Sequence, residues 1–251
     1  MILIFGDNHG EFRYICEVVK CLRPAAIVLL GDLTPERPLH EELAPALEHT
    51  LVRFLPGNHD TDTPDYYTNV FHSRLAHCNL HGKVETIAGV RIAGLGGVFR
   101  SSIWQPPQIP TFASHAAFVE QLRHKMRKPK VHRNPETAEE ILQGQARKHA
   151  STIFPDAYRR LEEEKADVLL THEAPSAHPY GVAALDQLAR RMGVRQSFHG
   201  HHHDALDYRP RWASLGFELY GVGFQGITAI DGRVVQPGKF DAHWASRRQV
   251  R

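Results

Sequence analysis

The sequence predicts an α/β fold with a mainly parallel sheet in the first part of the chain. Short apolar runs of strand length recur, helical patterns separate several of them, and several runs are continuously apolar. Continuous apolar runs are typical of strands that are covered on both faces, as the parallel strands of α/β proteins are. We interpret six runs as strands: 2–5, 25–30, 51–55, 90–95, 167–170 and 194–198.

Amphipathic helices are predicted between these strands. The segment 11–22 carries six apolar residues in helical spacing, which puts them on one face of a helix. The segments 39–50 and 181–192 show a similar pattern, although Pro45 interrupts the first of them. The alternation of strands and helices favours the α/β class.

The chain is expected to form one domain, 1–251, with a helical insertion at 104–165. The insertion begins with a proline-rich stretch that must be irregular. The segments 135–149 and 154–165 then read as helices, each with a proline near its start. After the insertion, 216–235 is expected to form short antiparallel strands, joined in part by an Asp-Gly turn.

Composition indicates a globular protein. Hydrophobic residues make up 42 % of the chain and charged residues 23 %, a balance that excludes a disordered chain. The first apolar run is too short for a signal-peptide core and no long apolar segment follows, so we expect a cytoplasmic protein with no membrane association. A net charge of +2 does not by itself imply a nucleic-acid partner.

Of the side chains that commonly bind metals, histidine is unusually frequent and cysteine is sparse. The chain has 18 histidines, and histidine is the commonest metal ligand in proteins. Only three cysteines are present, Cys16, Cys21 and Cys78, without the spacing of a zinc motif. We therefore expect reduced thiols in the core, and any metal site to be built from other ligands.

Metal-ligand residue types follow five of the six predicted strands. Open α/β sheets place ligands at the carboxyl ends of their strands, so these residues are expected to meet. One such residue alone is more often a core residue, but five strand ends with the same property are a strong pattern. The residues are Asp7 and His9; Asp32; Asn58, His59 and Asp60; His172; and His201 and His203.

The chemistry of this set points to two divalent cations. Carboxylates, imidazoles and one amide suit manganese or iron, and also zinc, better than an all-oxygen calcium site or a thiolate zinc site. The set exceeds the needs of one ion, so a carboxylate must bridge two. Burying Asp7 and Asp32 together without cations would be very costly.

These residues resemble the motif series of the calcineurin-like binuclear metallophosphoesterases. Every motif stands in the family's order between positions 6 and 203, while the insertion and the C-terminal tail lie outside the match. The resemblance implies a four-layer α/β/β/α sandwich with two mixed sheets. The matching motifs are Asp7-x-His9, Gly31-Asp32, Gly57-Asn58-His59-Asp60, His172 and Gly200-His201-x-His203.

The resemblance also implies a role for each residue. One metal would be bound by Asp7, His9, Asp32 and His203. The other would be bound by Asp32, Asn58, His172 and His201, so that Asp32 bridges the two. A hydroxide between the ions would attack the phosphorus of a phosphomonoester or phosphodiester. His59 would be the general acid, a step worth about 10²- to 10⁴-fold, and Asp60 would orient it.

The stretch HGHHHD contains two predicted ligands and two histidines that we interpret as structural. Alternation along an extended segment puts His201 and His203 on one side and His202 on the other. Alternation alone would put His199 on the same side as His201 and His203. Gly200, which breaks the strand geometry, and the family resemblance both favour the two histidines at 201 and 203.

The sequence also differs from related enzymes. Leu33-Thr34-Pro35-Glu36 stands where the superfamily's protein phosphatases have a phosphate-binding Asp-Arg-Gly, and Asp60 replaces their glutamate, which disfavours a phosphoprotein phosphatase. Arg13 or Arg100 would then contact phosphate, unless both are simply exposed arginines. His178 and Tyr180 are expected in a wall of the site formed by 171–181.

Two alternative functions remain open at this point. The first is a nuclease, because a basic stretch lies near aromatic residues that could stack on bases; we favour a solvated face of a helical cap instead. The second is a catalytically silent metal-binding scaffold, which is disfavoured because no ligand is missing. The oligomeric state is left open. The residues of the nuclease hypothesis are Arg123, Lys125, Arg127, Lys128, Lys130, Arg133, Trp104, Phe112 and Phe118.

Overall fold

Two five-stranded sheets face each other in the computed structural model, which describes residues 1–127 and 135–242. In the first sheet β1, β2 and β3 are parallel, β9 pairs antiparallel with β1, and β10 pairs antiparallel with β9. The order is β10 (Val234–Gln236), β9 (Ile227–Ala229), β1 (Ile2–Phe5), β2 (Ala26–Leu29), β3 (Leu51–Phe54). In the second only β4 is antiparallel, in the order β4 (Lys83–Ile87), β5 (Val90–Leu95), β6 (Val168–Thr171), β7 (Gln196–His199), β8 (Glu218–Gly221).

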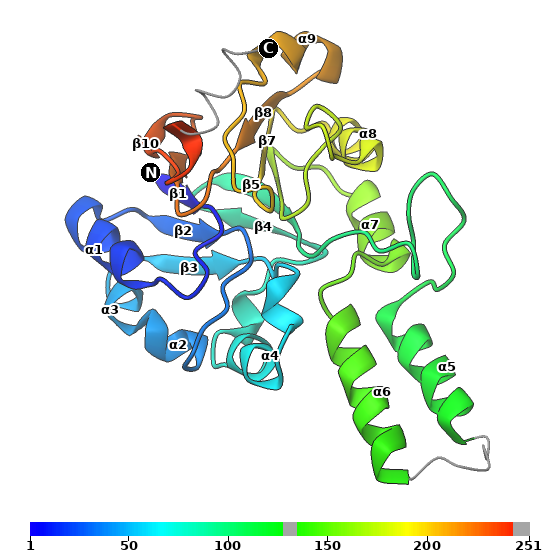
Figure 1. Ribbon diagram of the computed structural model, residues 1–251. Coiled ribbons are helices and arrows are strands. Elements are labelled where there is room, and N and C mark those ends of the chain that lie inside the picture. The colour runs from blue at the N-terminus through cyan, green and yellow to red at the C-terminus, as the bar shows by residue number, and fades with distance from the viewer. Residues whose placement is uncertain (128–134, 243–251) are drawn as a thin grey trace.

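Helices cover the outer face of each sheet (Figure 1). The first sheet packs against α1 (Arg13–Leu22), α2 (Leu39–Glu42) and α3 (Ala44–Leu47), and the second against α7 (Pro155–Glu162) and α8 (Ala183–Met192). Two sheets therefore lie between two helical layers. The predicted four-layer α/β/β/α sandwich is confirmed.

The alternation of side chains along β1 shows how the layers form. Leu3 and Phe5 pack with the helices over the first sheet, whereas Ile2 and Ile4 pack between the two sheets with residues of the second. Successive side chains of a strand point to opposite faces. A strand buried on both faces must therefore be apolar throughout, which is why the run 2–5 does not alternate.

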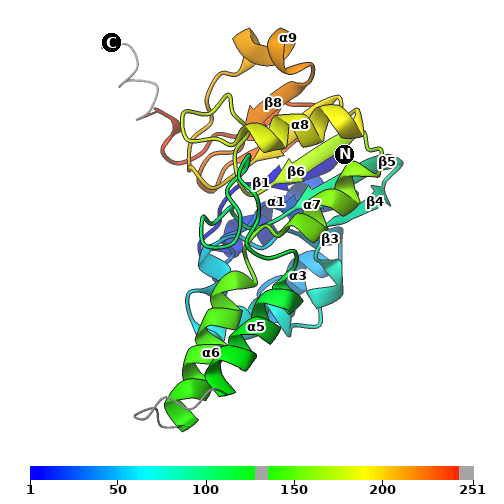
Figure 2. The same cartoon turned by 90° about the vertical axis from the view of Figure 1, so that its right-hand side faces the viewer.

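A hairpin of two helices projects from the sandwich (Figures 1 and 2). It consists of α5 (His115–Arg127) and α6 (Pro135–His149), which pack against each other. The sequence places α7 in the same insertion, but in the structure it lies on the second sheet, where Tyr158 and Leu161 are buried in the core shared with α8. The projecting part is thus smaller than 104–165.

Other elements differ from the expectations in detail. The segment 39–50 forms two short helices rather than one, and β4 does not stand out in the sequence. The predicted Asp-Gly turn is confirmed, since Gly232 donates its N–H to the carbonyl of Ala229 at 2.9 Å between β9 and β10. The expectation for β8 was wrong: it pairs in parallel with β7, because the long connection 200–217, which contains α9 (Trp212–Leu215), returns the chain to the start of the sheet.

Two expectations from composition can be compared with the structure. The three cysteines are unpaired thiols, but only Cys78 is buried, and Cys21 is exposed. Within residues 1–127 and 135–242, no helix is both long enough and apolar enough to cross a membrane. The cytoplasmic location stays a prediction.

Candidate metal centre

The predicted ligands meet at one end of the sandwich. Asp7, Asp32 and Asn58 follow β1, β2 and β3 of the first sheet, and His172 follows β6 of the second. The parallel strands within each sheet bring their carboxyl ends together. Asp7, Asp32 and His172 are all fully buried. The site is therefore built by both sheets and lies where their ends face each other.

One group of possible ligands combines His9, Asp32 and His203, whose ligand atoms all lie within 4.8 Å of one another. The Nε2 atoms of His9 and His203 are 3.1 Å apart. The Nε2 of His9 lies 3.7 Å from Oδ2 of Asp32, and the Nε2 of His203 lies 3.7 Å from Oδ2 of Asp7. Two imidazole nitrogens and the Asp32 carboxylate thus converge, and the Asp7 carboxylate lies beside His203.

A second group combines Asp32, His172 and His201, again with all ligand atoms within 4.8 Å. The Nε2 of His172 lies 3.5 Å from Oδ1 of Asp32 and 3.2 Å from Oδ1 of Asn58. Asp32 belongs to both groups, and its two oxygens face different imidazoles. This is the arrangement that a bridging carboxylate requires.

Buried polar atoms without partners test whether cations fit this centre. Among the described residues, Oδ1 of Asp7, Oδ2 of Asp32 and Nδ1 of His201 are buried with no hydrogen-bond partner. Burial, and next the charge of Asp32, hold the pKa of the Asp7 carboxyl well above its usual range. Unpaired buried carboxylates are costly, and bound cations would compensate them. The mixed oxygen and nitrogen donors fit divalent transition metals.

Two glycines allow the close approach of the ligands. Gly31 has a φ of +111°, and a Cβ on it would lie 2.5 Å from Nδ1 of His172. A Cβ on Gly57 would lie 2.2 Å from Oδ1 of Asp32. No other residue fits at these positions without displacing a ligand. The Nδ1–H of His172 donates to the carbonyl of Leu30 at 2.8 Å, which leaves its Nε2 available for a cation.

Strained backbone is concentrated in the same place. His9, Asp32, His201 and His203 have positive φ angles of 42°, 50°, 71° and 60°. This region is uncommon for residues other than glycine and costs of order 1–3 kcal/mol each. It also corrects the argument from alternation: His201 and His203 both reach the centre, but through left-handed turns rather than from an extended segment.

Comparison with known proteins agrees with this geometry. The family model for calcineurin-like phosphoesterases matches residues 1–205. The chain belongs to this family. An uncharacterized protein of Haemophilus influenzae is 36 % identical over 233 residues, covering 92 % of this chain and 95 % of the relative. The crystal structure of TT1561 of Thermus thermophilus has a TM-score of 0.50 at 14 % identity, covering 94 % of this chain and 98 % of the other, and shares the fold.

The other two histidines of HGHHHD have structural partners in the phosphoesterase. His199 is fully buried, its Nε2 is 3.0 Å from the hydroxyl of Tyr208, and burial lowers its pKa to about 3. His202 stacks on His178, with ring centroids 3.8 Å apart, and its Nε2 lies 3.7 Å from Oε1 of Glu173. His199 is thus engaged by its neighbours, whereas Nε2 of His202 is buried without a hydrogen-bond partner among the described residues, and His202 forms a third possible ligand group with Glu173 and His201. Glu173, which directly follows His172, does not stand out in the sequence, and its contact with His202 is shown only by the structure.

His59 lies at the rim of the centre rather than among the ligands. Its side chain is 46 % exposed, and its Nδ1 is 2.6 Å from Oδ2 of Asp62. The expectation that Asp60 orients His59 was wrong. Asp60 is fully buried and accepts the backbone N–H groups of Thr34 at 2.8 Å and Gly57 at 2.7 Å, so it joins two site loops instead. Asp62 stands three residues after His59, a spacing that the sequence could have suggested.

The four other residues predicted to contact substrate lie in different environments. Arg13 is exposed and forms an ion pair with Glu17 at 2.9 Å, away from the ligands. Arg100 lines a cavity that Asn58 also lines. His178 is buried with 3 % of its surface exposed, whereas Tyr180 is 80 % exposed. Of these four residues, only Arg100 lines this cavity, and His178 is closed to solvent.

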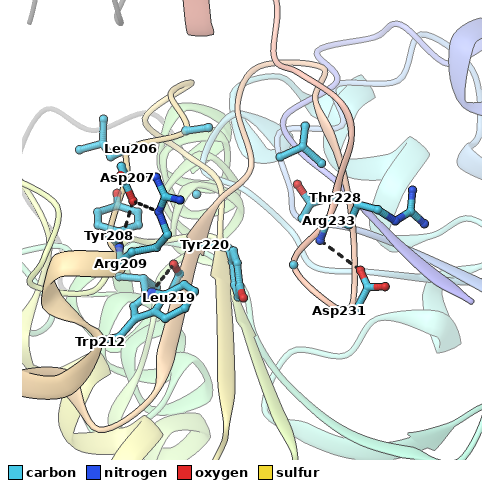
Figure 3. Close-up of a pocket in the computed structure, with 14 residues that line it drawn as sticks. Leu206, Asp207, Tyr208, Arg209, Trp212, Leu219, Tyr220, Thr228, Asp231 and Arg233 are labelled. Carbon is cyan, nitrogen blue, oxygen red and sulfur yellow. Dashed lines mark hydrogen bonds and ion pairs between the residues drawn. The ribbon is translucent and has the colours of Figure 1, made fainter.

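A larger cavity, of about 510 Å³, lies elsewhere in the phosphoesterase (Figure 3). Trp212, Leu219 and Tyr220 form one wall, and the β9–β10 hairpin with Thr228 and Asp231 forms the other. None of the residues that line it belongs to the predicted metal ligands. The size of a cavity therefore does not identify the site in this protein.

Asp62→Asn is expected to move the alkaline limb of the kcat–pH profile to lower pH. Burial lowers the pKa of His59, but the hydrogen bond that its Nδ1–H donates to Asp62 and the charge of Asp32 more than offset this and raise the pKa above 6.5. A general acid must be protonated, so losing the largest raising interaction loses activity first at high pH. Bound cations would lower the pKa of His59 in the wild type and in Asp62→Asn alike, so the difference between their two pH profiles reports the effect of Asp62. The control is Asp65→Asn, a change of a nearby exposed carboxylate, whose profile should match that of the wild type. If the profiles of the wild type, Asp62→Asn and Asp65→Asn superimposed, the role of Asp62 would be contradicted.

Proposed function

We propose that this member of the calcineurin-like phosphoesterases hydrolyses phosphomonoesters or phosphodiesters at a centre of two divalent cations. The observation that carries the proposal is the shared position of Asp32 in two ligand groups, with Oδ2 facing His9 and Oδ1 facing His172. A single ion would leave one group without a role. Manganese or iron is the expected metal, with zinc also compatible.

The chain supplies the ligands, and the cations supply the charge. The cations would generate hydroxide at neutral pH and neutralise the oxygens of the scissile phosphate. The first would be held by Asp7, His9, Asp32 and His203, and the second by Asp32, Asn58, His172 and His201. The backbone N–H of His59 donates to Oδ1 of Asp32 at 2.8 Å, which ties the loop of the general acid to the bridging carboxylate.

His59 would protonate the leaving oxygen. Its ring centroid is 5.5 Å from that of His9, so it stands beside the first ligand group. The Nδ1 contact with Asp62 fixes the ring and directs Nε2 away from Asp62. A proton on Nε2 is then available to a substrate oxygen at the rim, where solvent can later restore it.

A nuclease is the second candidate, and it stays a prediction. Phe118 packs edge-on against His149 and Trp104 packs edge-on against Tyr158, so these rings already have partners inside the protein. Arg123 and Lys125 are exposed on α5. Of the other basic residues in the hypothesis, Lys128, Lys130 and Arg133 lie outside the described residues, as does the side chain of Arg127.

One assay distinguishes the candidates. The purified full chain is loaded with Mn²⁺ and tested on p-nitrophenyl phosphate, bis(p-nitrophenyl) phosphate and single-stranded DNA, with an EDTA-treated sample as control. We expect turnover of at least one of the two small esters, lost with EDTA and restored by Mn²⁺. Cleavage of DNA alone would favour the nuclease. No turnover with two metals bound per chain, measured by mass spectrometry of the metal, would favour the scaffold and contradict the proposal.

A further inference from the structure

A cationic cavity of about 320 Å³ adjoins the metal centre. Asn58 and Asp62 line it on the side of the sandwich, and Gly144, Arg147 and Lys148 line it from α6 of the projecting hairpin. Asn58 is a predicted ligand and Asp62 is the partner of His59. The cavity is therefore next to the position of the scissile phosphate, but the insertion builds half of its wall.

Three cations face this cavity against one carboxylate. Arg100, Arg147 and Lys148 line it, and within residues 1–127 and 135–242 none of the three forms a salt bridge with Asp or Glu. The carboxylate, Asp62, is already paired with His59. Concentrated positive charge in a concave site attracts anions. The cavity thus has uncompensated positive charge, next to the position that the proposed function gives to a bound substrate.

The guanidinium groups are held in place by neutral partners. The Nε–H of Arg100 donates to Oγ1 of Thr152 at 3.0 Å, and the Nε–H of Arg147 donates to the carbonyl of Thr61 at 3.3 Å. Burial lowers the pKa of Arg100, and the charges of Asp62 and Asp32 partly offset this. These contacts fix one nitrogen of each arginine and leave the terminal nitrogens available.

The hairpin is anchored where it meets the cavity. His115 of α5 lies with its Nε2 2.8 Å from the carbonyl of Ala146, and Phe118 packs on His149 with centroids 4.6 Å apart. Oγ1 of Thr61 and Oγ of Ser151 are 2.7 Å apart. These contacts join the end of α6 to the loop after His59. The basic wall is thus positioned relative to the general acid.

Gly144 is the smallest residue in the helical wall of the cavity. It stands inside α6, where glycine costs about 1 kcal/mol relative to alanine. A Cβ at this position would meet no heavy atom within 4 Å, so neither packing nor a positive φ requires glycine. The absence of a side chain at Gly144 leaves space in the wall of the cavity.

We propose that this cavity binds a second phosphate group of the substrate, so that the enzyme acts on phosphate esters that carry two phosphates. The inference rests on the proposed function, because it takes the metal centre as the site of the scissile phosphate. Arginine pairs bind the oxygens of phosphate through parallel N–H donors, and an ammonium adds a point charge. Two guanidinium groups and one ammonium match a phosphate better than a carboxylate, which offers fewer oxygens.

Calorimetric titration of the Mn²⁺-loaded full chain tests the proposal. The His59→Asn background slows turnover, so that ligands stay intact. Two matched pairs are compared: fructose 1,6-bisphosphate with fructose 6-phosphate, and adenosine 3′,5′-bisphosphate with adenosine 5′-monophosphate. Charge-assisted hydrogen bonds predict at least about tenfold tighter binding of the bisphosphate in one pair or both. 6-Phosphogluconate, with a carboxylate as its second anion, should bind like the monophosphate.

Variants assign the effect to the cavity. The double variant Arg147→Ala/Lys148→Ala, and separately Gly144→Glu, should bind the bisphosphate no more than about threefold tighter than the matched monophosphate. Arg233→Ala, an exposed arginine that lines the separate cavity of Figure 3, should keep it. Equal binding within both pairs, a preference that survives in the variants, or equally tight binding of 6-phosphogluconate would each overturn the proposal. Wild-type turnover of p-nitrophenyl phosphate and bis(p-nitrophenyl) phosphate is measured separately, so a failure of the proposed function is recognised there.

Discussion

Asp32→Ala is expected to lose both bound cations and all measurable phosphoesterase activity. Its two oxygens face different ligand groups, 3.7 Å from Nε2 of His9 and 3.5 Å from Nε2 of His172. The same carboxylate also accepts the backbone N–H of His59. Removing it therefore empties both groups and releases the loop of the general acid. Metal content per chain, measured by mass spectrometry after gel filtration, should fall from two to near zero.

Comparison with other ligand variants makes this result specific. Of the two groups that share Asp32, His9→Ala and His201→Ala each remove a ligand of only one, so each should weaken one ion and leave the other bound. Asp231→Ala, a carboxylate at the distant cavity, is the matched control and should keep both. Bound metal stabilises the folded state by mass action, so Mn²⁺ should raise the melting temperature of the control but not that of Asp32→Ala. One ion retained in Asp32→Ala would show that this carboxylate does not bridge.

The main lines of the fold and the convergence of the predicted ligands were predictable because both depend on local sequence. The run 2–5 is apolar at every position because both faces of β1 are covered, by α1 on one side and by the second sheet on the other. Ligands stand directly after strands, and parallel strands end at the same edge. The positions of Asp7, Asp32 and His172 therefore follow from strand assignment alone.

Side-chain partners were less predictable because they depend on how segments pack. Asp60 and Asp62 are both acids close to His59, and only the three-dimensional structure shows that the first turns inward to Thr34 and Gly57 while the second meets the imidazole. In the same way α7 has the amphipathic pattern of the projecting helices, but it lies on the second sheet. Sequence patterns identify which face is buried and not what it is buried against.

The substrate cavity was beyond sequence reasoning for a related reason. Arg100 is a candidate phosphate contact from the sequence, but Arg147 and Lys148 lie in a helix far along the chain. Within the described residues, the basic stretch that does stand out in the sequence lies at the C-terminal end of α5 (His115–Arg127), and not on α6. Charge density along the sequence therefore pointed to a different part of the hairpin from the one that faces the metal centre.

His59→Ala is expected to lower kcat by about 10²- to 10⁴-fold while two cations stay bound. The side chain lies at the rim, 46 % exposed, and its contacts are with Asp62 rather than with a ligand carboxylate at hydrogen-bond distance. The backbone N–H that binds Asp32 is kept in the variant. Metal content should therefore equal that of the wild type. His72→Ala, an exposed histidine after α4 (Pro64–Phe71), is the control.

The leaving group decides whether His59 acts as an acid or only shapes the site. A p-nitrophenolate leaves readily without a proton, whereas the alkoxide of an alkyl phosphate does not, so His59→Ala should impair hydrolysis of alkyl esters far more than of p-nitrophenyl esters. The alkaline limb of the kcat–pH profile that Asp62→Asn moves should disappear in His59→Ala. An equal loss on both kinds of ester, with that limb still present, would mean that another group donates the proton and that His59 only positions the substrate.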